Sequence, residues 1–305
     1  MLSCDTYVIP ASLDDALAAV AASDGRFRFV AGATDLLPWA RESRAGDVHV
    51  PLMVDVANLP ELRGIKQHGE RIWIGAATPF QRFLDTSELM HLPAMPDCAV
   101  WFADNQIREV ATIGGNIVNA SPSADSIPPL LGASASVELA ALRDGSIRRR
   151  ILALADFVKG PGQVAAEQDE ILLGVECDAL EGYGGAFEKV GHRRSLAISV
   201  VCLSAALALD DSGRRIRDVR LAIGGVGPVA RRMTSIEQIL NGRPITSELV
   251  RAATRSCDHF VQSRTRQEYR KQVTTGFLAR SLAKAIRRAG AYEDVCAIVE
   301  EIAND

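Results

Sequence analysis

Two adjacent glycines in the run A-T-I-G-G-N-I (residues 111–117) constrain the fold of this chain more than any other feature. Paired glycines let the backbone approach a ligand closely and expose successive N–H groups in a concavity suited to phosphate oxygens. Thr112 and Asn116 add side-chain donors, and Asp125, flanked by small residues, is a suitable partner for a ribose hydroxyl. The alternative interpretation is an ordinary Gly-Gly turn before a strand.

A second turn with a glycine lies earlier in the chain, at Gly32-Ala33-Thr34-Asp35. A strand-like run that ends at Ala31 leads into it, so Thr34 and free N–H groups could face the same diphosphate. A plain strand-end turn, with Asp35 capping the next helical residues, explains the pattern equally well.

The N-terminal part of the sequence predicts short strands between helices. Ser12 can cap the start of a first helix, and Asp14 and Asp15 favour the positive end of its dipole. This helix is expected to stop near Gly25. Strands are expected at 27–31, 51–56, 71–76 and 171–176, a helix from Thr78-Pro79, a longer helix over much of 94–105, and a loop region at 112–129. The Asp-Gly turn at 144–145 predicts a hairpin between strands 136–142 and 146–151.

Three glycines and little periodicity at 179–185 place a domain boundary there. Beyond it, strands at 186–190, 199–209 and 219–223 are followed by helices at about 234–240, 247–262, 270–288 and 292–303. Several strands followed by packed helices indicate a smaller α+β second domain.

Composition and charge exclude several classes of protein. A net charge of −4 over 305 residues offers no basic field for a nucleic acid. No apolar run is long enough to span a bilayer, and the acidic amino terminus is unlike a signal peptide, so a cytoplasmic protein is expected. The six cysteines are scattered singly, which predicts buried thiols and no iron–sulfur or zinc site.

Other motifs in the chain carry no chemistry. The run G-V-G-P-V-A at 225–230 matches a dinucleotide-binding pattern, but only helices follow it, so a loop is expected. The five histidines show no metal-binding spacing, and there is no G-x-S-x-G motif of a hydrolase. The basic run at 148–150 predicts an exposed strand or part of a partner surface, and Arg193-Arg194 follow Lys189 near the expected domain junction.

The two turns together resemble a specific family. A-G-x-T-D-L near residue 32 and T-I-G-G-N near residue 114 are similar to the FAD domain of the molybdenum hydroxylase flavoproteins, which include the medium subunits of carbon monoxide dehydrogenase and bacterial xanthine dehydrogenase. The resemblance covers nearly the whole chain. Further matches lie at W-F-A (101–103), Q-I-R (106–108), S-P-S-A-D-S-I-P-P (121–129), D-E-I-L-L (169–173), F-E-K-V (187–190), R-R (193–194) and I-S (198–199).

This resemblance implies an α+β fold in two domains and a site for non-covalent FAD. Residues 1–180 would form a FAD-binding domain of the vanillyl-alcohol-oxidase (PCMH) type with two α+β lobes, and residues 181–305 a small α+β domain like that at the carboxyl end of carbon monoxide dehydrogenase flavoproteins. The diphosphate would be wrapped by Phe29, Val30, Ala31, Gly32, Ala33, Thr34, Asp35, Leu36, Thr112, Ile113, Gly114, Gly115 and Asn116. Asp125 would bind a ribose hydroxyl, and the flavin or adenine would lie along Phe102, Leu172 and Lys189.

The family's role is electron transfer, so no catalytic side chain and no metal ligand is expected in this chain. By resemblance, electrons come from [2Fe-2S] clusters of an iron–sulfur subunit and leave the reduced FAD for NAD or another acceptor. Hydroxylation takes place on a large molybdopterin subunit, and the expected assembly is (αβγ)2. The hydroxylated substrate, whether a purine, an aldehyde or an N-heterocycle, and the choice between NAD and oxygen stay open.

Two departures from the family and two alternatives accompany this interpretation. Ala33 stands where relatives often have a second glycine, so a positive φ there would cost energy unless the turn is of another type. The cysteine-rich insertion that carries an extra cluster in one branch is absent. The alternatives are a self-contained flavin oxidoreductase of the same fold, which would turn over a substrate alone, and a flavin-free scaffold subunit, which would be colourless.

Overall fold

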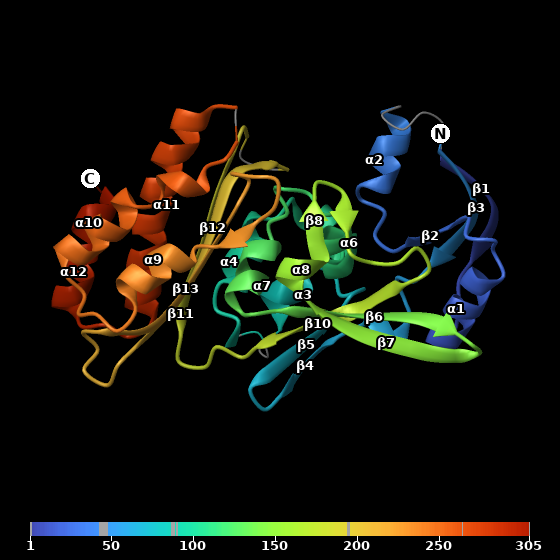
Figure 1. Cartoon of the computed structure of the whole chain (residues 1–305), viewed down its shortest axis with the longest axis horizontal. Helices are drawn as coiled ribbons and strands as arrows, with labels where there is room; N and C mark the ends of the chain where they lie inside the picture. The colour runs from blue at the N-terminus through green and yellow to red at the C-terminus, as the bar shows by residue number, and fades with distance from the viewer. Residues whose placement is uncertain are drawn as a thin grey trace.

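A computed structural model describes residues 2–42, 48–86, 89, 91–193, 196–263 and 265–304. Figure 1 shows a small N-terminal lobe at one end, a central lobe beside it, and a sheet covered by helices at the other end. The chain is thus a mixture of helices and strands in separate layers, as the α+β prediction requires.

The N-terminal lobe is a parallel sheet ordered β1-β3-β2, formed by Leu2–Val8, Val48–Asp55 and Phe27–Val30. Helix α1 (Leu13–Ala21) begins as predicted, because the Ser12 hydroxyl accepts a hydrogen bond from Asp15 N. Its buried Leu17 and Val20 pack with Val54 of the sheet. The short helix α2 (Leu36–Arg41) follows β2. Strand β1 was not predicted, and none of the side chains of Leu2–Val8 is fully buried.

The central lobe is an antiparallel sheet ordered β4-β5-β10-β6-β7. Its strands are β4 (Ile65–His68), β5 (Arg71–Gly75), β6 (Ser136–Arg143), β7 (Ser146–Ala153) and β10 (Ile171–Asp178). The predicted hairpin is confirmed: Asp144 and Gly145 have φ of 49° and 73°, the left-handed pair of a type I′ turn. Around the sheet lie η1 (Pro60–Leu62), α3 (Arg82–Asp85), α8 (Leu154–Phe157) and the small pair β8 (Val158–Gly160) and β9 (Gln163–Val164).

One of two predictions for the segment between 94 and 132 was wrong. The helix expected over much of 94–105 is present as α4 (Met95–Trp101), and a separate helix α5 (Asn105–Val110) follows, because Ala103 has a φ of 47° and Asp104 caps a new helix. The expected loop at 112–129 contains α6 (Ile113–Val118) and α7 (Ile127–Gly132). The helix α6 contains both glycines, which disfavour a helix by propensity; a cap and tertiary contacts compensate for this.

The C-terminal part is an antiparallel sheet covered on one side by helices. The sheet runs β11 (Gly184–Gly191), β12 (Ser199–Leu209), β13 (Ile216–Gly224) and β14 (Arg231–Arg232). Helices α9 (Thr234–Leu240), α10 (Ser247–Arg255), α11 (Gln267–Arg288) and α12 (Glu293–Asn304), with η3 (Asp258–Phe260), bury a separate apolar core against it. The predicted helix over 247–262 is shorter, because it ends at Arg255 and a 3-10 turn follows. The chain passes between the two sheets at 179–183, and the boundary between 180 and 181 stays a prediction.

Candidate functional site

The two glycine-bearing segments meet in space at one cleft of about 670 Å³. The strand end and turn from Phe29 to Leu36 form one wall, and Thr112, Gly115 and Asn116 form another. The contact between them is direct, because a Cβ placed on Gly32 would lie 1.9 Å from the carbonyl oxygen of Val110. Only a residue without a side chain allows this approach.

The turn after β2 supplies the free donors of the cleft. Within the described part of the chain, the backbone N–H groups of residues 31–36 donate to no protein acceptor. Ala33 adopts the left-handed conformation with a φ of 55°, and Asp35 returns to the right-handed helical region. Such a change of hand turns successive N–H groups toward one point and creates an anion-binding concavity. The turn therefore has the positive φ that makes an alanine costly at this position.

Asp35 brings a carboxyl group close to these donors. It precedes α2, but its side chain does not cap that helix, contrary to the capping alternative. Burial raises the pKa of this carboxyl above its ordinary value.

The Gly-Gly motif has a different role from the one predicted. Gly114 N donates to Ala76 O at 2.8 Å, Gly115 N donates to the Thr112 hydroxyl at 3.1 Å, and Ile113 N donates to Thr78 O at 3.0 Å. These N–H groups are therefore not free for phosphate, because they begin helix α6 and attach it to the neighbouring segment. A Cβ on Gly114 would lie 2.6 Å from that of Ala76, so this glycine is required for packing.

Side chains of α6 still offer polar groups to the cleft. The Asn116 side-chain oxygen accepts a hydrogen bond from Ser126 at 2.6 Å, which leaves its amide nitrogen without a protein acceptor among the described residues. The Thr112 hydroxyl accepts from Gly115 N and keeps its own hydrogen to donate.

A buried ion pair joins the two domains at the cleft. Lys189 Nζ on β11 lies 2.5 Å from Asp125 Oδ2, and the two side chains are 4% and 6% exposed. Ser199 donates to the other carboxylate oxygen at 2.5 Å, and Lys189 also donates to Trp101 O at 3.2 Å. Burial raises the pKa of Asp125, while the Lys189 ammonium and the Ser199 hydroxyl pull it back.

The remaining predicted residues divide between the cleft and the core. Phe102 lines the cleft and stacks flat on Phe80, with ring centroids 3.7 Å apart. Leu172 lies in β10, where it is buried in the core and lines no part of this cleft. Ile113 and Gly114 are also buried outside its lining.

Several lining residues were not among the predicted site residues. They are the apolar Trp39 and Val118, the small Ser121 and Ser123, and Leu196 and Ile198 from the second domain. Of these, Ile198 is 76% exposed. A pattern reading of sequence gives no signal for such positions. Arg193 also lines the cleft, whereas Arg194 lies outside the described residues.

The structure also places other features that the sequence singled out. The six cysteines are unpaired, and no group of three metal-binding side chains occurs within the described residues. The G-V-G-P-V-A run forms a loop, as expected, in which Arg270 donates to the carbonyl oxygens of Val200 and Gly225. Among the residues that the structure describes, no helix is both long and apolar enough to cross a membrane.

The geometry fits the diphosphate of a dinucleotide: the cleft combines a concavity of free N–H groups, a free amide and hydroxyl on the facing helix, and a lysine in its lining.

Comparison with known proteins points the same way. Residues 2–177 match the family model of the FAD binding domain in molybdopterin dehydrogenase, and residues 186–285 match that of the CO dehydrogenase flavoprotein C-terminal domain.

Relatives and solved structures agree over most of the chain. The xanthine dehydrogenase FAD-binding subunit of Escherichia coli O157:H7 is 31% identical over 298 residues, covering 95% of this chain and 99% of that protein. The carbon monoxide dehydrogenase medium chain of Hydrogenophaga pseudoflava is 30% identical over 250 residues, covering 81% and 83%. A solved structure of carbon monoxide dehydrogenase from the same organism has a TM-score of 0.82 at 25% identity, covering 92% of this chain and 97% of that one. This chain therefore belongs to the FAD-binding subunits of the molybdenum hydroxylase family, which are parts of oxidoreductases.

Proposed function

We propose that FAD lies non-covalently in the cleft between the two domains, with its diphosphate on the free N–H groups of the turn at 31–36. The observation that carries this proposal is that run of N–H groups without acceptors, opposite α6. Thr34 and the Asn116 amide would add side-chain donors, while Gly32 keeps the two walls in contact.

Asp125 and Lys189 would define the inner end of the same site. Each carboxylate oxygen of Asp125 accepts one hydrogen bond within the protein and retains a lone pair for a ribose hydroxyl. The Lys189 ammonium is paired with Asp125 at the junction of the domains, where it favours the charged form of that carboxylate. Phe102 would contact a ring of the cofactor, whereas Leu172, buried in β10, lines no part of the cleft.

Bound FAD would supply the redox chemistry: it would take electrons from [2Fe-2S] clusters of a partner subunit and deliver them to NAD or another acceptor. The names of the relatives, a FAD-binding subunit and a medium chain, support an assembly of several chains. The proposed partners are an iron–sulfur subunit and a large molybdopterin subunit, with (αβγ)2 as the proposed stoichiometry. The exposed Ile198 and Leu196 at the cleft are candidate contacts with the iron–sulfur subunit.

Two measurements test this proposal. FAD titration of the purified chain, followed by flavin absorbance, should give one site, and Asn116→Leu should weaken it about tenfold by removing a donor to the diphosphate. A tagged chain should co-purify with an iron–sulfur and a molybdopterin subunit, and the complex should reduce NAD or another acceptor. A colourless chain that takes up no FAD, or a lone chain that turns over a substrate, would contradict the proposal.

A further inference from the structure

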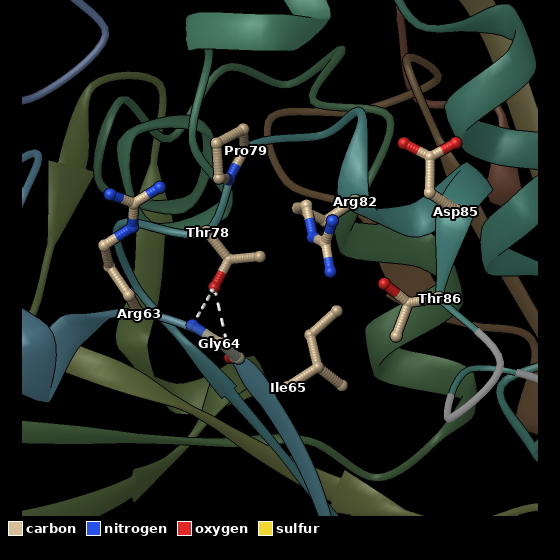
Figure 2. A pocket seen from close by; sticks show the side chains of 8 residues that line it. All are labelled: Arg63, Gly64, Ile65, Thr78, Pro79, Arg82, Asp85 and Thr86. Atoms are coloured by element: carbon tan, nitrogen blue, oxygen red, sulfur yellow. Dashed lines mark hydrogen bonds between the residues drawn. The ribbon is translucent and has the colours of Figure 1, made fainter.

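A second cavity, of about 430 Å³, lies outside the cleft described above and shares no lining residue with it. Its walls come from the start of β4, from the segment after β5, and from α3, as Figure 2 shows. The lining residues are Arg63, Gly64, Ile65, Thr78, Pro79, Arg82, Asp85 and Thr86.

Positive charge dominates this second cavity. The Arg82 guanidinium points into the space between Thr78 and Thr86 (Figure 2), and within the described residues it forms no ion pair and no hydrogen bond. Arg63, on the other side, donates to the Asn58 side-chain oxygen at 2.9 Å and has no carboxylate partner in the described part of the chain. Among the described residues, neither of these lining arginines has a carboxylate partner.

The one acid among the described lining residues points away from the cavity. Figure 2 shows the Asp85 carboxylate directed away from the centre of the cavity. It instead accepts weak hydrogen bonds from the Gln81 amide, at 3.5 and 3.4 Å. An anion near Arg82 would thus not meet this carboxylate directly.

One hydroxyl of the second cavity has no partner. The Thr86 hydroxyl is shielded from solvent and forms no hydrogen bond among the described residues, and in Figure 2 it faces the same space as Arg82. Buried donors without acceptors are rare in native proteins, because they lose hydration and gain nothing in return. The Thr78 hydroxyl differs, since it already exchanges hydrogen bonds of 3.1 Å with Gly64 N and O.

From these observations we propose that the second cavity binds a phosphate monoester. The phosphate would accept hydrogen bonds from the Arg82 guanidinium, with Arg63 adding charge at the rim, because a planar guanidinium matches phosphate oxygens well. A rotation of the Thr86 side chain would bring its shielded hydroxyl within reach of the same phosphate. The cavity is much larger than the roughly 30 Å³ that one water occupies. The space beyond the phosphate therefore suits an organic group, which Ile65 and Pro79 would contact.

This second site is close to the FAD cleft but separate from it. Thr78 O accepts from Ile113 N at 3.0 Å and Phe80 N donates to Ala111 O at 2.9 Å, so one backbone segment separates the cavity from the start of α6. The test is therefore made on the full chain saturated with FAD, so that phosphate cannot occupy the diphosphate position of the cleft. Flavin absorbance reports FAD loading independently, and a failure of FAD binding is thus distinguishable from a failure of the second site.

Calorimetric titration with phenyl phosphate and with inorganic phosphate tests the proposal. We expect saturable binding of both at one site per chain, with phenyl phosphate binding more tightly because its ring reaches the apolar wall. Arg82→Gln should weaken both at least tenfold, whereas Arg148→Gln, which removes an exposed arginine on β7, should leave them unchanged. Free phosphate binding as tightly as the ester would instead identify the simple ion as the ligand and overturn the monoester.

The unpartnered hydroxyl offers a second, independent variant. Thr86→Val keeps the shape of the side chain and removes the buried donor, so it should raise the melting temperature of the ligand-free chain and weaken phenyl phosphate binding several-fold. Absence of saturable binding, equal binding to wild type and Arg82→Gln, or benzoate binding as tightly as phenyl phosphate would each overturn the phosphate monoester site.

Discussion

The buried pair Lys189 and Asp125 yields the sharpest prediction of the structure. Lys189→Met keeps the length of the side chain and leaves Asp125 buried beside Ser199 without its counter-charge. Breaking one partner of a buried ion pair costs about 3–5 kcal/mol, far more than a surface pair contributes. We therefore expect the free energy of unfolding, measured by urea and circular dichroism on the FAD-free chain, to fall by about that amount near neutral pH.

The pH dependence distinguishes this explanation from a simple loss of packing. Burial raises the pKa of Asp125, and Lys189 opposes that rise. Without the lysine, the folded state binds a proton more strongly than the unfolded state does, so stability is highest below the ordinary carboxyl pKa and declines as pH rises through the folded value. The loss in Lys189→Met should thus be smaller at about pH 5 than at about pH 8.

Two matched variants complete this test. Adding Asp125→Asn to Lys189→Met removes the isolated charge and should restore at least about 2 kcal/mol. Lys271→Met, which breaks an i,i+3 pair whose acid is 79% exposed, should cost less than about 1 kcal/mol. A loss below about 1 kcal/mol in Lys189→Met, equal at both pH values, would refute the argument that this pair is a buried charge at the domain junction.

Three further predictions concern the walls of the cleft. Ala33→Gly should raise the free energy of unfolding by up to about 1 kcal/mol, because φ is 55°, and a lower thermal midpoint would contradict this. Gly32→Ala should weaken FAD binding at least tenfold in an absorbance titration, because the new Cβ would lie 1.9 Å from the Val110 carbonyl oxygen. As a control, Gly145→Ala should leave FAD binding intact, because no atom lies within 4 Å of the Cβ position there. Thr112→Ala should lower the free energy of unfolding by about 1 kcal/mol in urea, because it removes the cap of α6, and an unchanged midpoint would count against that cap.

The sequence predicted most of the fold wherever local signals agreed with the tertiary structure. Ser12 and its acidic neighbours marked α1, and the Asp-Gly turn marked the β6–β7 hairpin, because caps and turns are local chemistry. Local rules failed at α6, which starts at Ile113 and includes Gly114 and Gly115. That helix depends on hydrogen bonds to a segment more than thirty residues earlier, which no window of sequence contains.

The cleft was predicted in outline, but the different hydrogen bonding of its two walls was not. The sequence predicted that the two glycine-bearing segments meet at one cleft, as the structure shows, and the structure adds that Asp125 and Lys189 are partners across the two domains. The sequence could not reveal that pairing, because the two residues lie 64 positions apart in different domains. Likewise, Leu172 matches the family pattern but is placed in the core by the register of β10 with β6.

The two turns differ because the backbone N–H groups of one have protein acceptors and those of the other do not. The N–H groups of α6 are occupied because the helix packs against the segment after β5, and Gly114 permits that contact. The turn after β2 is also held against another segment, because Gly32 contacts Val110. Its N–H groups beyond Gly32, however, have no acceptor in the described part of the chain. Glycine thus brings backbone close to backbone in both segments, and an anion would bind where the change of hand at Ala33 leaves donors unused. If so, Ala33→Gly should preserve FAD affinity even though it alters the strained residue, because the donors belong to the backbone and not to the methyl group.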